Sequence, residues 1–230
     1  ARCFGMNMPK SRDIQAKMPS PKVILNAFWL VTVKVLNSYK SEKDMDGNIL
    51  LWIQDHLRWE GMNWFWKGIT SLGNGGWFWI VLYILMVVLA KISGEKCSIK
   101  NENCSRAVIG RAGWYGLLSM GAGALITNVC LKNLVARTRP YEVVEGLVPL
   151  ISKPTDYSFP SGHTLSSAAC ATVLTLENRK FAYGAIPMAV LIAFSRLYLY
   201  LHFPTDVIGG ELIGIAIGYT AFKLAKKQII

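Results

Sequence analysis

The segment WFWIVLYILMVVLAKI, residues 77–92, decides the fold class of this chain. Its only charged side chain is Lys91, one residue from its end. At about 1.5 Å per residue, a helix of this length covers most of the roughly 30 Å hydrocarbon core of a bilayer. The segment therefore predicts a helix that crosses a membrane.

Comparable segments recur along the chain, and together they predict an all-α, polytopic membrane helical bundle. The chain is 52% hydrophobic and only 17% charged, which is more apolar than soluble domains of 230 residues are. Further spans are predicted at 112–131, 163–176, 181–200 and 206–224, and a more polar one at 23–39. The expected total is six transmembrane helices.

The basic residues are spread over short segments between these apolar blocks. The net charge of +11 therefore fits loops on the cytoplasmic side of a membrane, and it argues against nucleic-acid binding. Loop 93–111, the N-terminal tail 1–22 and the C-terminus are predicted to be cytoplasmic, with 23–230 as one membrane-embedded domain. Because Asn26 and Lys34 are polar, the segment 23–39 could instead lie in the membrane interface. If it crosses the membrane, every basic segment lies on the cytoplasmic side, and crossing is therefore favoured.

The segment NILLWIQDHLRW, residues 48–59, predicts an extra helix that lies in the outer membrane interface after the first span. The residues expected on its apolar face are Ile49, Trp52, Ile53 and Leu57. His56 is interpreted as an interfacial polar residue, and SLGNGG at 71–76 as a turn.

Small residues and cysteines carry two further expectations. Gly210, Gly214 and Gly218 recur every four residues, which predicts close helix packing in the last span. The five cysteines are odd in number and lack metal-like spacing, so unpaired thiols are favoured over a disulfide framework.

Three polar clusters at the predicted outer ends of spans form a candidate anion site. LKNLVARTRP (131–140) holds Lys132 and Arg139, and AFSRLYLYLHFPTD (193–206) holds Arg196. No carboxylate at matching spacing is expected to neutralise these three cations, and unpaired cations near a membrane are costly, so an external phosphate is the natural partner. FPSGH (159–163) places Ser161 and Gly162 at a predicted helix N-terminus, which favours the same anion.

Two histidines add catalytic groups to this site. His202 and Asp206 are four residues apart, a spacing at which a carboxylate can hold the imidazole in one tautomer and leave the other nitrogen free to attack. His163, on another element, could protonate the leaving oxygen as a general acid. Together these residues predict cleavage of a phosphomonoester or diphosphate through a phosphohistidine. No carboxylate cluster of the kind that magnesium phosphatases use is present on this face.

The three clusters in order resemble the signature of the type 2 phosphatidic acid phosphatase superfamily. That signature reads lysine, six residues, Arg-Pro; then Pro-Ser-Gly-His; then Ser-Arg, five residues, His, three residues, Asp; residues 132–206 match it throughout. The resemblance implies His202 as nucleophile with Asp206 as its orienting partner, and His163 as acid and later base. It implies a phosphate site made by Lys132, Arg139, Arg196, Ser161 and Gly162. It also implies an enzyme that needs no metal or cofactor and is inhibited by vanadate.

The resemblance further implies a substrate class and a place for the reaction. A site at the outer bilayer surface suits a lipid phosphate or diphosphate such as undecaprenyl diphosphate, phosphatidylglycerol phosphate or phosphatidic acid. The expected location is the cell membrane, with the bilayer and the lipid as partners; the sequence specifies no oligomeric state.

The alternative is a membrane protein that binds or transports anions without cleaving them, which would not need the His202–Asp206 pair. The apolar spans argue against the soluble vanadium haloperoxidases of the same superfamily. The carboxylates of the loop 141–158, which are Glu142, Glu145 and Asp156, are interpreted as solvated charges or as selectivity determinants.

Overall fold

The computed structural model describes residues 45–92 and 104–229. The predicted basic tail 1–22 and the predicted first span 23–39 lie outside the described residues.

Within the described ranges the chain is helical and contains no strand, so the all-α prediction is confirmed. Residues 45–56 form a first helix. The remaining helices are α2 (Glu60–Leu72), η1 (Asn74–Gly76, a 3-10 turn), α3 (Trp77–Ile92), α4 (Ser105–Leu125), η2 (Ile126–Leu131, a π-helical segment), α5 (Lys132–Val135), α6 (Pro140–Val143), α7 (Gly162–Glu177), α8 (Arg179–Tyr198) and α9 (Pro204–Ile229).

Four segments of the described chain are long and apolar enough to cross a membrane. They are Asn74–Ile92, Ser105–Val143, Arg179–Tyr198 and Pro204–Lys227, and they correspond to four of the predicted spans. Helix α4 begins seven residues before the predicted start at residue 112, which shortens the predicted loop. Arg111 consequently lies on α4, where it is buried and donates a 2.7 Å hydrogen bond to Glu177 at the end of α7.

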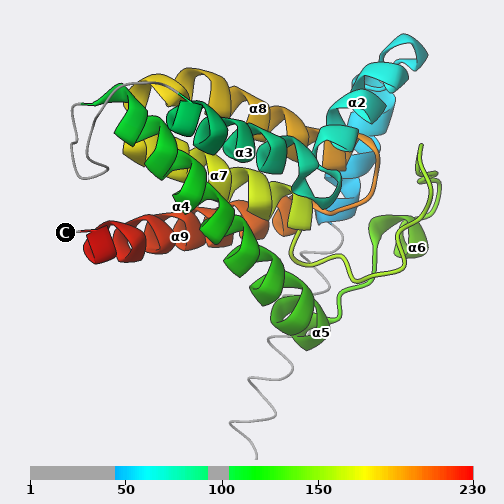
Figure 1. Cartoon of the computed structure of the whole chain (residues 1–230). Helices are drawn as coiled ribbons and strands as arrows, with labels where there is room; N and C mark the ends of the chain where they lie inside the picture. Colours follow the sequence, from blue (N-terminus) through cyan, green and yellow to red (C-terminus); the bar gives the residue numbers. More distant parts are fainter. Residues whose placement is uncertain (1–44, 93–103, 230) are drawn as a thin grey trace, which may run out of the picture. The chain divides into compact units, whose positions relative to one another are not determined.

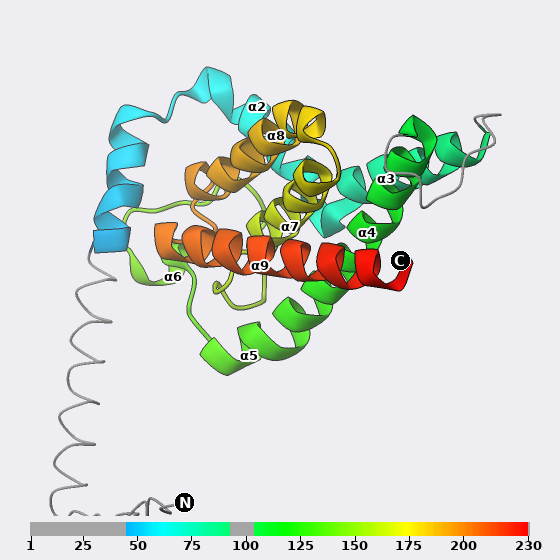
Figure 2. The ribbon, with the colours of Figure 1, turned by 90° about the vertical axis from the view of Figure 1, so that its left-hand side faces the viewer.

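Helix α7 coincides with the predicted span 163–176 but is shorter than the four. Its 16 residues extend about 24 Å at 1.5 Å per residue. It packs against α9, α8 and α4, and Figures 1 and 2 show it among these helices with α9 alongside. A helix surrounded by protein needs small side chains more than lipid-facing ones, which explains its run of serines, alanines and threonines.

The contact between α7 and α9 depends on glycines. A Cβ atom at Gly214 would lie 2.4 Å from the carbonyl oxygen of Leu165, and one at Gly218 would lie 2.5 Å from that of Ala169. The prediction of close packing in the last span is therefore confirmed. The same approach brings the ends of the two helices together, and the Ser161 amide donates a 3.1 Å hydrogen bond to the Asp206 carbonyl.

The N-terminal part of the described chain contains one more helix than the sequence predicts. The helix at 45–56 exposes Ile49 and Trp52, as expected for an interfacial helix, but Ile53 is buried against the α8–α9 connection and not on the exposed face. Helix α2 follows directly and buries Trp66 and Thr70. No helix was predicted at these residues, where Gly61 and Gly68 weaken the helical pattern.

Two of the three cysteines in the described ranges, Cys130 and Cys170, carry free thiols. The third, Cys104, is disulfide-bonded, so the prediction of unpaired thiols is wrong there. Sequence spacing does not report how a connecting loop folds, which is what decides whether two thiols meet.

Candidate active site

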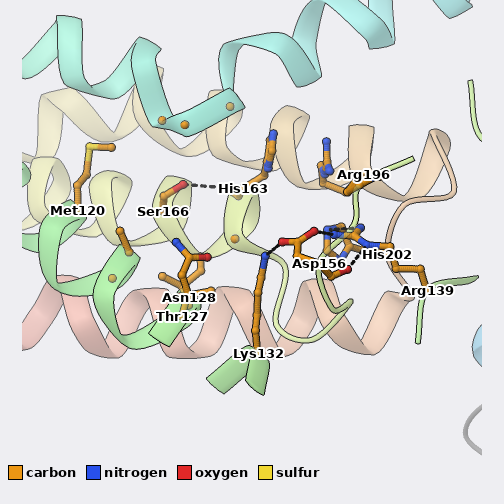
Figure 3. Close-up of a pocket in the computed structure, with 18 residues that line it drawn as sticks. Met120, Thr127, Asn128, Lys132, Arg139, Asp156, His163, Ser166, Arg196 and His202 are labelled. Carbon is orange, nitrogen blue, oxygen red and sulfur yellow. Dashed lines mark hydrogen bonds and ion pairs between the residues drawn. The ribbon is translucent and has the colours of Figure 1, made fainter. Parts of the chain in front are cut away.

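The three polar clusters converge on one cavity of about 430 Å³ between η1, α4, α7 and the α8–α9 connection. Six of the eight predicted site residues line it: Lys132, Arg139, Gly162, His163, Arg196 and His202 (Figure 3). The other two, Ser161 and Asp206, have no exposed surface and are hydrogen-bonded to each other through their backbones. The structure thus brings these eight residues together at one cavity and directly behind its wall.

His202 lies in the turn between α8 and α9 and is buried. Its Nδ1 is 2.7 Å from the carbonyl oxygen of Ser158, an acceptor only, so Nδ1 carries the proton and Nε2 keeps its lone pair. Arg139 Nη1 lies 3.4 Å from Nε2. Burial lowers the pKa of His202 to about 4; Asp206 opposes this effect, and the guanidinium groups of Arg196 and Arg139 add to it. The ring is therefore neutral near pH 7, as a nucleophile requires.

The contact predicted between His202 and Asp206 is less direct than the spacing suggested. Asp206 Oδ2 lies 3.8 Å from Nδ1, which is too far for a hydrogen bond. The same oxygen accepts hydrogen bonds from Ser158 Oγ at 2.5 Å and from the Phe203 amide at 2.9 Å. Asp206 thus fixes the hydroxyl of Ser158, and the carbonyl of Ser158 accepts the hydrogen bond that orients the imidazole.

The prediction that no carboxylate neutralises the cations is wrong for two of them. Asp156, on the loop before α7, forms ion pairs with Lys132 and, at 2.5 Å, with Arg139 Nη2 (Figure 3). Partial burial would raise the pKa of Asp156, but Lys132 and Arg139 outweigh it and lower the pKa to about 2. The interpretation of Asp156 as a solvated loop charge is therefore also wrong. The contacts span 24 and 17 residues through an irregular loop, which no sequence spacing could indicate.

Arg196 differs from the other two cations because no carboxylate pairs with it among the described residues. Its guanidinium is buried, Nη1 donates a 2.6 Å hydrogen bond to Thr70 Oγ1 on α2, and Nε has no partner. A buried, unpaired guanidinium at a cavity wall is costly unless an anion binds there.

His163 lies in the first turn of α7 and lines the same cavity as His202 (Figure 3). Its Nε2 is 2.9 Å from Asn74 Oδ1 on η1. Gly73 lies against the ring, where an added Cβ would be 2.5 Å from His163 Cδ2. The glycine-rich turn predicted at 71–76 therefore also determines where this imidazole lies. By contrast, His56 is exposed, and its Nδ1 lies 3.0 Å from the carbonyl oxygen of Trp52 on its own helix.

Several site residues were missed by sequence reasoning. Arg137 lies within the first motif and Ser158 directly before the second, and this proximity was the available signal. Asp46, Thr70 and Asn74 lie in the N-terminal part and carry none. Within the described ranges, no group of three or more histidine, cysteine or acidic residues could hold a metal ion.

Comparison with known proteins identifies the family. The PAP2 superfamily model matches residues 112–230, just over half of the chain, and the chain belongs to this superfamily. The resemblance inferred from the three motifs is thereby confirmed.

Two curated relatives are named phosphatases. The chain is 38% identical over 103 residues to an undecaprenyl-diphosphatase of Sulfolobus acidocaldarius, covering 44% of this chain and 50% of the relative. It is 35% identical over 121 residues to phosphatidylglycerophosphatase B of Bacillus subtilis, covering 46% and 55%. The chain thus matches about half the length of these relatives.

A solved structure shares the fold over most of the chain. A transmembrane PAP2-type phosphatidylglycerolphosphate phosphatase from Bacillus subtilis superimposes with a TM-score of 0.62 at 24% identity, covering 89% of this chain and 96% of that one. Together with the apolar helices, these similarities place the protein in a membrane.

Proposed function

We propose that this protein is an integral-membrane lipid phosphatase that hydrolyses a lipid phosphate or diphosphate through a phosphohistidine at His202. The observation that carries the proposal is the buried, neutral imidazole of His202. Its unprotonated Nε2 is 3.4 Å from Arg139, in a cavity that His163 also lines.

Substrate binding uses the cations that line the cavity. The phosphate displaces the Asp156 carboxylate from between Lys132 and Arg139, since a phosphate and a carboxylate offer these cations the same kind of oxygen acceptor. Arg196 supplies the guanidinium that has no carboxylate partner. The amides at the N-terminus of α7, beginning at Gly162, complete the anion site.

The reaction proceeds in two displacements at phosphorus. Nε2 of His202 forms the N–P bond while the P–O bond to the lipid breaks, and His163 gives its proton to the leaving oxygen. His163 then accepts a proton from water, the water oxygen attacks phosphorus and the N–P bond breaks. Phosphate leaves and both histidines return to their starting states.

A lipid substrate is favoured by the apolar helices that surround the cavity. Undecaprenyl diphosphate, phosphatidylglycerol phosphate and phosphatidic acid present a phosphate at the bilayer surface, and the names of the two relatives include the first two. Lateral entry between helices would deliver such a headgroup. If a water-soluble phosphate monoester had a higher kcat/KM than every lipid in a panel, lateral entry would be excluded.

The proposed topology has six spans with both termini cytoplasmic and the site facing the extracytoplasmic side. It includes the predicted span 23–39 and the basic tail 1–22, and it counts α7 as a span held within protein. The distribution of basic residues supports this orientation. Labelling of single cysteines placed in each connection, from either side of sealed vesicles, tests it.

Phosphate release from the lipid panel in the presence of EDTA tests the activity and separates it from non-hydrolytic anion binding. His202→Ala should lower kcat by at least about 10³-fold, because the nucleophile is lost. His56→Ala changes an exposed histidine of the same chain and should leave kcat unaltered. Full activity of purified His202→Ala would overturn the proposal.

The proposed mechanism also predicts a bell-shaped dependence of kcat/KM on pH. Activity rises with pH as His202 loses its proton, near pH 4 from its lowered pKa, and falls when His163 can no longer donate one. A rate that stays constant across the histidine range, with chemistry rate-limiting, would contradict the assigned roles.

A further inference from the structure

A buried charged cluster lies behind His202, on the side away from the cavity. Arg137 forms ion pairs with Asp46 at 2.7 Å and with Asp206 at 2.6 Å. The exposed fractions of the Asp46, Arg137 and Asp206 side chains are 1%, 8% and 0%, so water contributes little to their solvation. Arg137 Nη1 also donates to Thr205, and the guanidinium lies 4.3 Å from the centre of the Phe203 ring.

The cluster joins three segments that are far apart in sequence. Asp46 belongs to the helix at 45–56, Arg137 to the connection between α5 and α6, and Asp206 to the first turn of α9. Ala136 adopts a left-handed backbone conformation, with φ of 47°, which ends α5 and turns the chain just before Arg137.

Arg137 reaches His202 by way of Ser158. The Arg137 carbonyl accepts a 2.8 Å hydrogen bond from the Ser158 amide, while its guanidinium holds Asp206, which accepts from Ser158 Oγ. Ser158 is therefore fixed through its amide and its hydroxyl. Its carbonyl is the group that accepts the Nδ1 proton of His202.

We propose that Arg137 and Asp46 are positioning residues that hold Ser158 and Asp206 so that His202 keeps its reactive tautomer. This role rests on the proposed function, in which Nε2 of His202 attacks phosphorus. Neither residue touches the substrate. Arg137 fixes the two groups behind the imidazole, and Asp46 compensates part of the guanidinium charge and ties it to the N-terminal helix.

The net charge of the cluster makes the role measurable. Two carboxylates around one guanidinium leave one negative charge, which favours the protonated form of His202. Asp46→Asn removes that excess and should shift the acidic limb of kcat/KM to lower pH, whereas Arg137→Gln doubles it and should shift the limb to higher pH. A negative charge favours the protonated form of an imidazole and a positive charge disfavours it, which sets the direction of each shift. The other charged or titratable groups facing His202 are unchanged in these variants: Arg139 and Arg196 beside it, and Lys132, Asp156 and His163 around the cavity.

The experiment measures kcat, KM and the pH profile of the full-length protein in detergent with one lipid phosphate substrate. Arg137→Gln should lower kcat by roughly 10- to 100-fold with little change in KM, because a small displacement of a reacting group is costly. Arg137→Lys should recover part of kcat. The double variant Asp46→Asn/Arg137→Gln restores the net charge of the cluster and should return the acidic limb toward that of the wild type. Asp55→Asn, on the exposed side of the same helix, is the matched control.

Three results would overturn the inference. These are wild-type kcat and pH profiles in folded Arg137→Gln and Asp46→Asn, shifts of the acidic limb in the same direction for both, or losses confined to KM. Asp46→Asn is nearly isosteric, so it supplies a folded variant if Arg137→Gln does not fold. His202→Ala separates failure of the proposed function from failure of the positioning role. If His202→Ala retains activity, the proposed function fails. If His202→Ala is inactive while the Arg137 and Asp46 variants behave like the wild type, only the positioning role fails.

Discussion

The segment 132–206 and the N-terminal segment 45–76 contribute to the same cavity in different ways. The first holds every group proposed to touch phosphate, and its residues match the family motifs. The second holds side chains that support the first: Thr70 binds Arg196, Asn74 binds His163, and Asp46 binds Arg137 behind His202. The family match begins at residue 112, after this second segment. Reacting groups can thus be recognised from motifs, while several of the residues that hold them in place belong to a part of the chain without a motif.

The largest effect is expected in the segment 132–206. His163→Ala removes the proposed general acid and should lower kcat by about 10²- to 10⁴-fold, with substrate binding largely retained. Steady-state kinetics on a lipid phosphate, with thermal unfolding as the check on folding, measure this. A substrate whose leaving group needs no proton should be less affected, and equal losses on both substrates would argue against an acid role.

The second-largest effect is expected from a change in the N-terminal segment. Gly73→Ala places a Cβ 2.5 Å from His163 Cδ2, so the ring must rotate away from Asn74. The backbone at Gly73 has φ of −84°, which alanine adopts without strain. The expected loss in kcat is about 10²-fold, typical of a misplaced catalytic group.

Gly68→Ala is the matched control for this variant. It makes the same substitution on α2, where an added Cβ meets nothing within 4 Å. Equal activity of the two variants would show that the N-terminal segment does not position His163.

A smaller effect is expected at the contact between α2 and Arg196. Thr70→Val removes the hydroxyl that accepts the 2.6 Å hydrogen bond from Nη1 and keeps the shape of the side chain. Hydrogen bonds to charged groups contribute about 1.5–3 kcal/mol, and substrate phosphate compensates part of this, so we expect KM to rise about tenfold. Thr220→Val, at an exposed site on α9, should leave KM unaltered. An unchanged KM in Thr70→Val would mean that Arg196 needs no support from α2.

The smallest effect is expected at Asp156, where the substitution should strengthen phosphate binding and not weaken activity. Asp156→Asn removes the carboxylate that pairs with Lys132 and Arg139, so inorganic phosphate should inhibit severalfold more strongly. Glu145→Gln, an exposed carboxylate on the same loop, should not change the inhibition constant. Weaker inhibition in Asp156→Asn would contradict displacement of Asp156 by phosphate and would make Asp156 a part of the phosphate site.

These contrasts also indicate what the sequence could predict. Four spans and α7 were located within a few residues, except at the start of α4, because long apolar segments report helices directly. The predicted site residues could be selected because phosphate chemistry needs particular side chains at fixed spacing, and six of them line one cavity. The ion pairs of Asp156 were not predicted, because they depend on the path of an irregular loop. Similarly, the four-residue spacing of His202 and Asp206 suggested direct contact, but the Ser158 carbonyl lies closer to Nδ1.

The central claim is that His202 becomes phosphorylated during turnover. The direct measurement is to quench the protein under alkaline conditions while it turns over a lipid carrying labelled phosphate, and then to map the labelled residue. The account predicts an acid-labile phosphoryl group on Nε2 of His202 that is absent from His202→Ala and accumulates when His163 is changed. Label on any other residue, or turnover that leaves the protein unlabelled, would contradict it.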